Sequence, residues 1–252
     1  MLLAPKKALA AVGMSMVPEL LIFDCDGVLI DSEPASSRVL WQALAASGVS
    51  ISHAEVHQRF TGYSEADCHR ICIDDLGVAE PGPLFAAARA NLYEEFSRTL
   101  APMRGIAELI RSLDCRKCVA SNSSIERLER SLGLFDLWHA FAPHIFSAEM
   151  VARPKPAPDL FLFCAERLGV APAKCLVVDD SAYGIKGAID AGMTAIGFVD
   201  LADPRPNRRA ALLAAGAGAV AEGAEELAVL LGTHGSGVNP FNRQLGAAAL
   251  PA

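Results

Sequence analysis

The chain of 252 residues is long enough for one large or two small domains, and its 52% hydrophobic content can form a substantial core. A formal charge of −7, with no run rich in lysine or arginine, gives no basis for binding nucleic acid or an anionic membrane surface. No apolar run approaches the ~20 residues that a membrane span needs. We therefore expect a globular protein that acts on a small molecule.

The two ends of the chain are expected to lie outside the folded part. Residues 1–17 form an N-terminal extension that leads directly into the first apolar run. Residues 232–252 are rich in Gly, Asn and Ala without periodicity, which predicts a poorly ordered tail. The seven cysteines are an odd number scattered through apolar segments, which indicates reduced thiols and a cytoplasmic protein.

The first predicted strand, Leu20–Phe23, is followed at once by two aspartates, Asp24 and Asp26. Aspartate is a poor strand former and is costly to desolvate, so this placement indicates that the negative charge has a function. Residues 35–100 then show helical periodicity and no convincing strand, which predicts an inserted, all-helical cap domain. The prolines at its two ends mark hinges that would let the insert move as one body.

From Pro102 onward, helical and strand patterns alternate. This alternation is typical of βαβ units on a parallel sheet. We therefore predict an α/β fold with a Rossmann-like three-layer core, formed by residues 18–34 and 101–231, and a helical cap at 35–100. The expected strands cover 117–121, 144–147, 174–179, 194–198 and 217–220, and the expected helices cover 105–113, 125–132, 157–168, 182–191 and 224–231.

Reactive side chains follow several of these strands. In an open parallel sheet, ligands bind outside the carboxyl ends of the strands, where loops and helix N-termini converge. Four carboxylates at one edge repel one another unless a divalent cation lies among them, and a site made only of oxygen ligands suits Mg²⁺. A lysine and a hydroxyl beside that ion suit a phosphoryl group, whose charge must be offset during transfer. The residues placed at this edge are Asp24, Asp26, Ser121, Lys155, Asp179 and Asp180.

The first two aspartates can divide the chemistry between them. Asp24, at the strand tip, can attack phosphorus and form an aspartyl-phosphate. Asp26 points the same way as Asp24 if the local backbone is extended. It can then protonate the leaving oxygen and later take a proton from the attacking water. Gly27 permits a tight turn directly behind the pair.

Four ordered segments resemble the signatures of the haloacid dehalogenase superfamily of hydrolases. They are FDCDGV at 23–28, VASNS at 119–123, KPAPD at 155–159 and VVDDSAYGI at 177–185, and the resemblance spans residues 18–231. The insert after the first signature resembles the cap of the sugar-phosphate phosphatases, such as 6-phosphogluconate phosphatase, and of the β-phosphoglucomutases.

The resemblance assigns roles to the candidate residues. It implies that Asp24 is the nucleophile and Asp26 the general acid and base. It implies that Ser121 and Lys155 hold the transferring phosphoryl group. It further implies a Mg²⁺ site made by Asp24, the Asp26 carbonyl and Asp180, with Asp179 as a further ligand or a neighbour of the ligands.

Some candidates keep a structural alternative. Ser121 could instead cap the helix near Ile125, and for Asn122 helix capping and substrate contact remain equally open. Arg153 could help to bind anions or could lie at the surface. In the cap, the turn of Thr61, Gly62 and Tyr63 precedes a helix at 65–76 with Ser64 as its expected N-cap. The resemblance implies that this turn helps to choose the substrate.

Phosphatases, phosphomutases and dehalogenases share this framework. Asp26 argues against a dehalogenase, because halide departs without a proton. The mutases resemble one another in a histidine after the first signature and an arginine in the cap turn, where this chain has Ser36 and Glu65. Mg²⁺-dependent hydrolysis of a sugar or sugar-acid phosphate is therefore the leading hypothesis, with a phosphomutase as the alternative and a receiver-like or non-catalytic binding protein behind it. We expect a monomer or a weak homodimer.

Overall fold

The computed structural model describes residues 17–61, 65–203 and 205–233. The chain divides into two compact units. The first contains the described residues up to Leu29 and from Pro102 onward, and the second is Ile30–Ala101. The predicted terminal extension and tail lie outside the described residues, apart from Val17, Gly232 and Thr233.

The first unit is built around a parallel sheet. Within the described residues the strand order is β3-β2-β1-β4-β5-β6. β1 lies near the middle, and its Phe23 pairs in register with Val119 of β2 and Val178 of β4. All four residues of β1 are buried, as expected for a strand covered on both faces. The strands are β1 (Leu20–Phe23), β2 (Lys117–Ser121), β3 (Ile145–Ser147), β4 (Cys175–Asp179), β5 (Thr194–Val199) and β6 (Ala219–Glu222).

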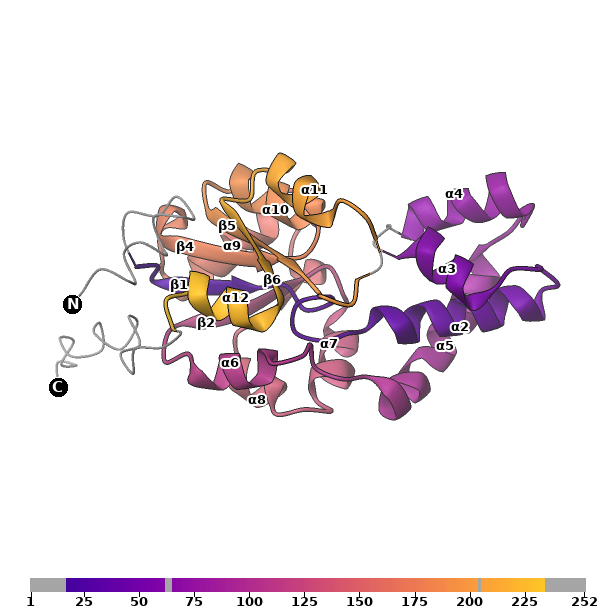
Figure 1. The fold of residues 1–252 in the computed structure, drawn as a ribbon, viewed down its shortest axis with the longest axis horizontal. Helices are drawn as coiled ribbons and strands as arrows, with labels where there is room; N and C mark the ends of the chain where they lie inside the picture. Colours follow the sequence, from indigo (N-terminus) through magenta and orange to yellow (C-terminus); the bar gives the residue numbers. More distant parts are fainter. Residues whose placement is uncertain (1–16, 62–64, 204, 234–252) are drawn as a thin grey trace. The chain divides into compact units, whose positions relative to one another are not determined.

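Helices cover both faces of the sheet, which gives three layers (Figure 1). On one face, Phe161, Ile185 and Leu212 pack against strand residues such as Ile22. On the other face, the ring of Phe141 packs on that of Phe23, with centroids 5.8 Å apart. The first layer contains α9 (Asp159–Leu168), α10 (Ala182–Asp190) and α11 (Arg208–Ala214), and the second contains α6 (Ile106–Ser112), α7 (Ile125–Leu132), α8 (Leu137–Phe141) and α12 (Gly223–Leu230).

The second unit is helical throughout its described residues. Its core is formed by apolar side chains such as Leu44, Phe60 and Phe85, while Val39 and Phe96 belong to a further cluster. Hydrophobic burial of this kind stabilises helices more than intrinsic propensity does. The helices are α2 (Glu33–Ala46), α3 (His53–Phe60), α4 (Glu65–Leu76) and α5 (Gly82–Thr99).

The predicted fold class is confirmed, with small shifts of the elements. The last strand begins at Ala219 rather than at residue 217, and α9 begins at Asp159 rather than at residue 157. Pro34 lies in the first turn of α2, a position that proline favours because the first helical N–H has no partner in the helix. The short helices α8 and α11, and the 3₁₀ turns Ala148–Met150 and Pro172–Lys174, were not predicted.

No helix in the described ranges combines the length and the apolar character needed to cross a bilayer.

Candidate active site

Polar side chains gather at the carboxyl ends of β1, β2 and β4. Asp24 follows β1, Ser121 ends β2 and Asp179 ends β4. The backbone N–H of Asp24 donates to the carbonyl of Val178 at 2.9 Å, which keeps Asp24 level with the end of β4. Lys155 reaches the same edge from the loop before α9, so segments far apart in sequence meet here.

Lys155 lies between two carboxylates. Its Nζ donates to Oδ1 of Asp24 at 2.9 Å and to Oδ2 of Asp179 at 2.7 Å. The lysine side chain is 3% exposed, and its Nζ lies 5.0 Å from the centre of the Phe161 ring. Burial alone would lower the pKa of Lys155, but the two carboxylates outweigh it and raise that pKa. The ammonium is therefore a fixed positive charge at the edge of the sheet.

Asp24 sits where its negative charge is costly. Burial raises its pKa from the usual 3.8 to about 7, Lys155 opposes that shift, and Asp179 and Asp26 add to it. A carboxylate in such surroundings gains from any further positive charge that binds beside it. This is the electrostatic condition expected of a site that takes up a cation.

Asp179 is fully buried and is held from two sides. Besides Lys155, its carboxylate accepts hydrogen bonds from Ser181, through the backbone N–H at 2.9 Å and the hydroxyl at 2.7 Å. The Ser181 hydroxyl in turn caps α10 by accepting the N–H of Gly184 at 2.9 Å. A Cβ on Gly184 would lie 1.9 Å from Oδ2 of Asp179, so only glycine allows the carboxylate to lie against this helix.

Asp180 is held by two arginines that the sequence analysis did not single out. Nη2 of Arg208 lies 3.0 Å from Oδ2 of Asp180, and it also donates to the Asp180 carbonyl. Nη2 of Arg205 lies 4.0 Å from the same carboxylate. Asp203 binds both guanidinium groups and keeps them together. Arg208 opens α11, where the helix dipole disfavours a positive charge, and this unusual position was the available sequence signal.

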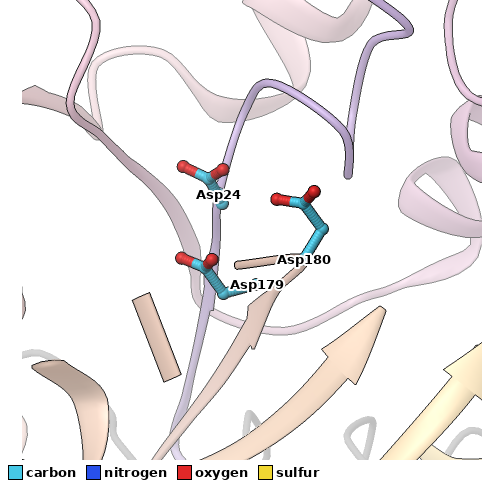
Figure 2. Close-up of side chains that lie close together, drawn as sticks. All are labelled: Asp24, Asp179 and Asp180. Atoms are coloured by element: carbon cyan, nitrogen blue, oxygen red, sulfur yellow. The ribbon is translucent and has the colours of Figure 1, made fainter. Parts of the chain in front are cut away.

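Three carboxylates form a candidate cation site (Figure 2). Asp24, Asp179 and Asp180 each offer one oxygen, and these oxygens all lie within 4.8 Å of one another. A set of carboxylate oxygens matches the hard ligands that Mg²⁺ prefers. The residues present therefore fit a bound Mg²⁺, with Lys155 offsetting part of the remaining charge.

Asp26 is bound by two side chains from the segment after β2. Its Oδ1 accepts from Nη2 of Arg127 at 2.9 Å, and its Oδ2 accepts from the Ser123 hydroxyl at 2.8 Å. Asp26 and Arg127 are about one quarter exposed, at 24% and 25%. The sequence analysis missed Arg127, although it also lies in the first turn of a helix, α7, against the helix dipole.

Ser121 and Asn122 do not cap α7. Ser124 is the N-cap residue, and its hydroxyl accepts the N–H of Arg127 at 3.2 Å. Ser121 is buried, and its hydroxyl accepts the N–H of Ser123 at 3.0 Å. The Asn122 amide makes two hydrogen bonds to the backbone of Lys155, so it bridges β2 and the lysine loop.

Of the remaining candidates, Arg153 belongs to the first unit and Thr61 to the second. Arg153 is exposed and forms a two-point ion pair with Asp159, with N–O distances of 2.7 and 3.1 Å. Thr61 belongs to the second unit, where it is buried and its hydroxyl lies 3.3 Å from Nδ1 of His57. Gly62, Tyr63 and Ser64 lie outside the described residues, as does the side chain of Glu65.

The sequence matches a known protein family and a curated relative. A family model described as haloacid dehalogenase-like hydrolase matches residues 18–192. A protein of Escherichia coli (strain K12) named 6-phosphogluconate phosphatase is 32% identical over 192 residues, which cover 74% of this chain and 84% of the relative.

Two solved structures extend this likeness to the fold. A haloacid dehalogenase-like protein from Agrobacterium tumefaciens has a TM-score of 0.76 and 34% identity, covering 85% of this chain and 97% of that one. A HAD family hydrolase from Deinococcus radiodurans, solved with bound phosphate and sodium, has a TM-score of 0.74 and 29% identity, covering 86% and 97%.

Proposed function

Because the chain belongs to the haloacid dehalogenase-like hydrolase family, we propose that it hydrolyses a small phosphomonoester through an aspartyl-phosphate on Asp24. The observation that carries this proposal is the buried Lys155 ammonium between Asp24 and Asp179, because it sets a fixed positive charge beside an attacking oxygen. The relative named 6-phosphogluconate phosphatase supports a sugar or sugar-acid phosphate as substrate. The phosphate bound in the Deinococcus structure supports a phosphoryl site on this fold.

In the first half of the reaction, an oxygen of Asp24 attacks phosphorus. The new Asp24 O–P bond forms as the bond from phosphorus to the substrate oxygen breaks. Asp26 gives its proton to that departing oxygen, which leaves as the sugar hydroxyl. Lys155 and the Ser121 hydroxyl hold the phosphoryl oxygens during the transfer.

In the second half, water attacks the aspartyl-phosphate. Asp26, now a carboxylate, takes a proton from that water, the Asp24 O–P bond breaks, and inorganic phosphate is released. Arg127 and Ser123 hold the Asp26 side chain, so both proton transfers would start from a fixed position. Each round restores both aspartates to their starting protonation.

Mg²⁺ would be held by Asp24, Asp180 and the Asp26 carbonyl, with Asp179 as a further ligand or a neighbour of the ligands. When bound, the ion would offset the charge of the phosphoryl oxygens and of the clustered carboxylates. Arg208 would hold the Asp180 carboxylate in place at this site.

Two further predictions belong to this proposal. All seven cysteines are free thiols, which supports a cytoplasmic location because thiols stay reduced there. We expect the protein to act as a monomer or a weak homodimer and to bind a small phosphorylated metabolite.

A panel of sugar, sugar-acid and polyol phosphates tests the proposal. We expect Mg²⁺-dependent release of inorganic phosphate, reversible loss of activity in EDTA, and loss of activity in Asp26→Ala. The specificity constants would rank the substrates. Turnover that is unchanged by EDTA would contradict the Mg²⁺ dependence. Transfer of phosphate to a second position of a sugar phosphate, without its release, would favour the mutase alternative.

A further inference from the structure

We propose that Asn122 is a positioning residue for Lys155, which it fixes through the lysine backbone while the phosphoryl group is transferred. The inference rests on the function proposed above and adds a role to a residue that touches no reacting atom in it. Oδ1 of Asn122 accepts the N–H of Lys155 at 3.0 Å, and Nδ2 of Asn122 donates to the Lys155 carbonyl at 3.1 Å. One side chain therefore binds both polar groups of one residue.

The sequence around Lys155 makes these two bonds important. Pro154 and Pro156 flank the lysine, and proline has no backbone N–H. The N–H of Lys155 is thus the only amide hydrogen in this three-residue segment, and Asn122 accepts it. The loop is joined to the end of β2 at the point where the catalytic lysine leaves it.

The lysine side chain is consequently fixed at both ends. Asn122 holds the backbone end, and Asp24 and Asp179 hold the ammonium. The ring of Phe161 packs 5.0 Å from Nζ. A long, flexible side chain is thereby confined to one path across the edge of the sheet, which reduces the entropy lost when it binds a phosphoryl group.

The hydrogen bonds from Asn122 to Lys155 should have their largest effect on the rate while the phosphoryl group is transferred to Asp24. When Asp24 gives an oxygen to phosphorus, the ammonium exchanges part of its contact with Asp24 for contact with the phosphoryl oxygens. At that moment the carboxylates hold Lys155 less firmly, while its backbone contacts with Asn122 remain unchanged. We therefore expect the loss of Asn122 to affect the chemical step more than substrate binding.

Two substitutions separate the two hydrogen bonds. Asn122→Ala removes both. Asn122→Asp has nearly the same shape and keeps an acceptor for the Lys155 N–H, but it places a carboxylate against the Lys155 carbonyl and removes the donor. Asn91→Ala is the matched control, because Asn91 is an exposed residue of α5 in the other unit.

The experiment measures amide exchange and steady-state kinetics on the full chain. In Asn122→Ala we expect faster exchange of the Lys155 amide by NMR and a kcat about 10- to 100-fold lower, with a smaller change in KM. Asn122→Asp should retain part of the amide protection and still lose kcat. Asn91→Ala should match the wild type in both measurements.

A double-mutant cycle with Lys155→Met identifies the route of the effect. If Asn122 acts through the lysine, Asn122→Ala should reduce kcat little further once Lys155 has been replaced. Full additivity, or a wild-type kcat in Asn122→Ala, would overturn the inference. So would unchanged exchange of the Lys155 amide. Failure of the proposed function would differ, because the wild type itself would then release no phosphate from any substrate of the panel.

Discussion

Each unit of the molecule contains a buried carboxylate in an ion pair, but the two carboxylates have different surroundings. Asp179 in the first unit is 0% exposed, and its partner Lys155 is only 3% exposed. Glu95 in the helical unit is 5% exposed, but its partner Arg38 is 46% exposed. Both acids are paired, and only the second pair is in contact with water.

The difference distinguishes a site from a structural contact. The Arg38–Glu95 pair links α2 and α5 within the helical unit, and Glu95 also lies 3.7 Å from a second cation, Arg98, so the loss of Arg38 has a modest cost. Lys155 instead binds two acids at once, the fully buried Asp179 and the mostly buried Asp24, so little solvent can replace it. So costly an arrangement at the edge of the sheet supports our proposal that these residues act in catalysis.

The largest expected effect comes from replacing Asp24, one of the two acids that bind Lys155. Asp24→Asn should lower kcat by about 10⁴-fold or more, because the amide oxygen is a poor nucleophile and the aspartyl-phosphate cannot form. Fold and thermal stability should be retained, since the substitution removes a charge that burial disfavours. Asp190→Asn, at an exposed aspartate paired with Lys186, is the control and should have normal activity. An active Asp24→Asn protein would remove the nucleophile assignment.

Removing the cation from each pair compares the two units directly. In Mg²⁺-free buffer, Lys155→Met should reduce the free energy of unfolding by about 3 kcal/mol, because it leaves the buried Asp179 and the mostly buried Asp24 without their cation. Arg38→Met should reduce it by only about 0.5 kcal/mol. Urea unfolding measures both values. Equal losses in the two variants would contradict the distinction between them.

Replacing Arg127 should lower kcat less than replacing Asp24 does, and more than replacing Arg130, an exposed arginine of the same helix. Arg127→Met removes one of the groups that hold Asp26, and we expect kcat to fall about tenfold. Arg130→Met is the matched control, because Arg130 is 56% exposed and pairs with Glu126 one turn away. A wild-type kcat in Arg127→Met would mean that Arg127 is not needed to position Asp26.

The two units should also differ in the direction in which their stability depends on pH. Burial raises the pKa of Asp24 to about 7, so in Mg²⁺-free buffer its contribution to stability is lost as pH rises from about 4 to 7. The pKa of His53 is lowered below its usual 6.5, mainly by burial and further by Arg38 and His57. The contribution of His53 to stability is therefore lost as pH falls below about 6.5.

Urea unfolding at pH 5 and pH 8 measures both contributions. Asp24→Asn should remove the loss of stability at high pH, and His53→Gln should remove the loss at low pH. Added Mg²⁺ should flatten the Asp24 dependence and leave that of His53 unchanged. If the free energy of unfolding of Asp24→Asn and of wild type had the same pH dependence without Mg²⁺, burial would not destabilise the charged form of Asp24.

The sheet was predictable because its strands are short and mostly apolar, and because β2, β3 and β4 end in serine or aspartate. Leu20–Phe23 and Lys117–Ser121 were predicted with their observed bounds, since a strand buried on both faces needs a continuous apolar run. The five-residue helix α8 has too few turns to show periodicity, and it was missed.

The site was predictable only where a residue type is itself unusual at a strand end. Asp24 and Asp179 were found in this way, and Lys155, from the loop before α9, lies within hydrogen-bond distance of both. Arg127 and Arg208 were missed because, although an arginine in the first turn of a helix lies against the helix dipole, the sequence does not show which acid it binds. Their partners depend on tertiary contacts, and local sequence does not encode these.

The central claim is that Asp24 becomes covalently phosphorylated during turnover. The most direct test is to quench the Mg²⁺-loaded enzyme during hydrolysis of its best substrate, reduce the acyl-phosphate with borohydride, and locate the modified residue by mass spectrometry. We predict conversion of residue 24 to homoserine in the wild type and no modification in Asp24→Asn. Modification at another residue, or none while a burst of product shows that an intermediate accumulates, would contradict the account.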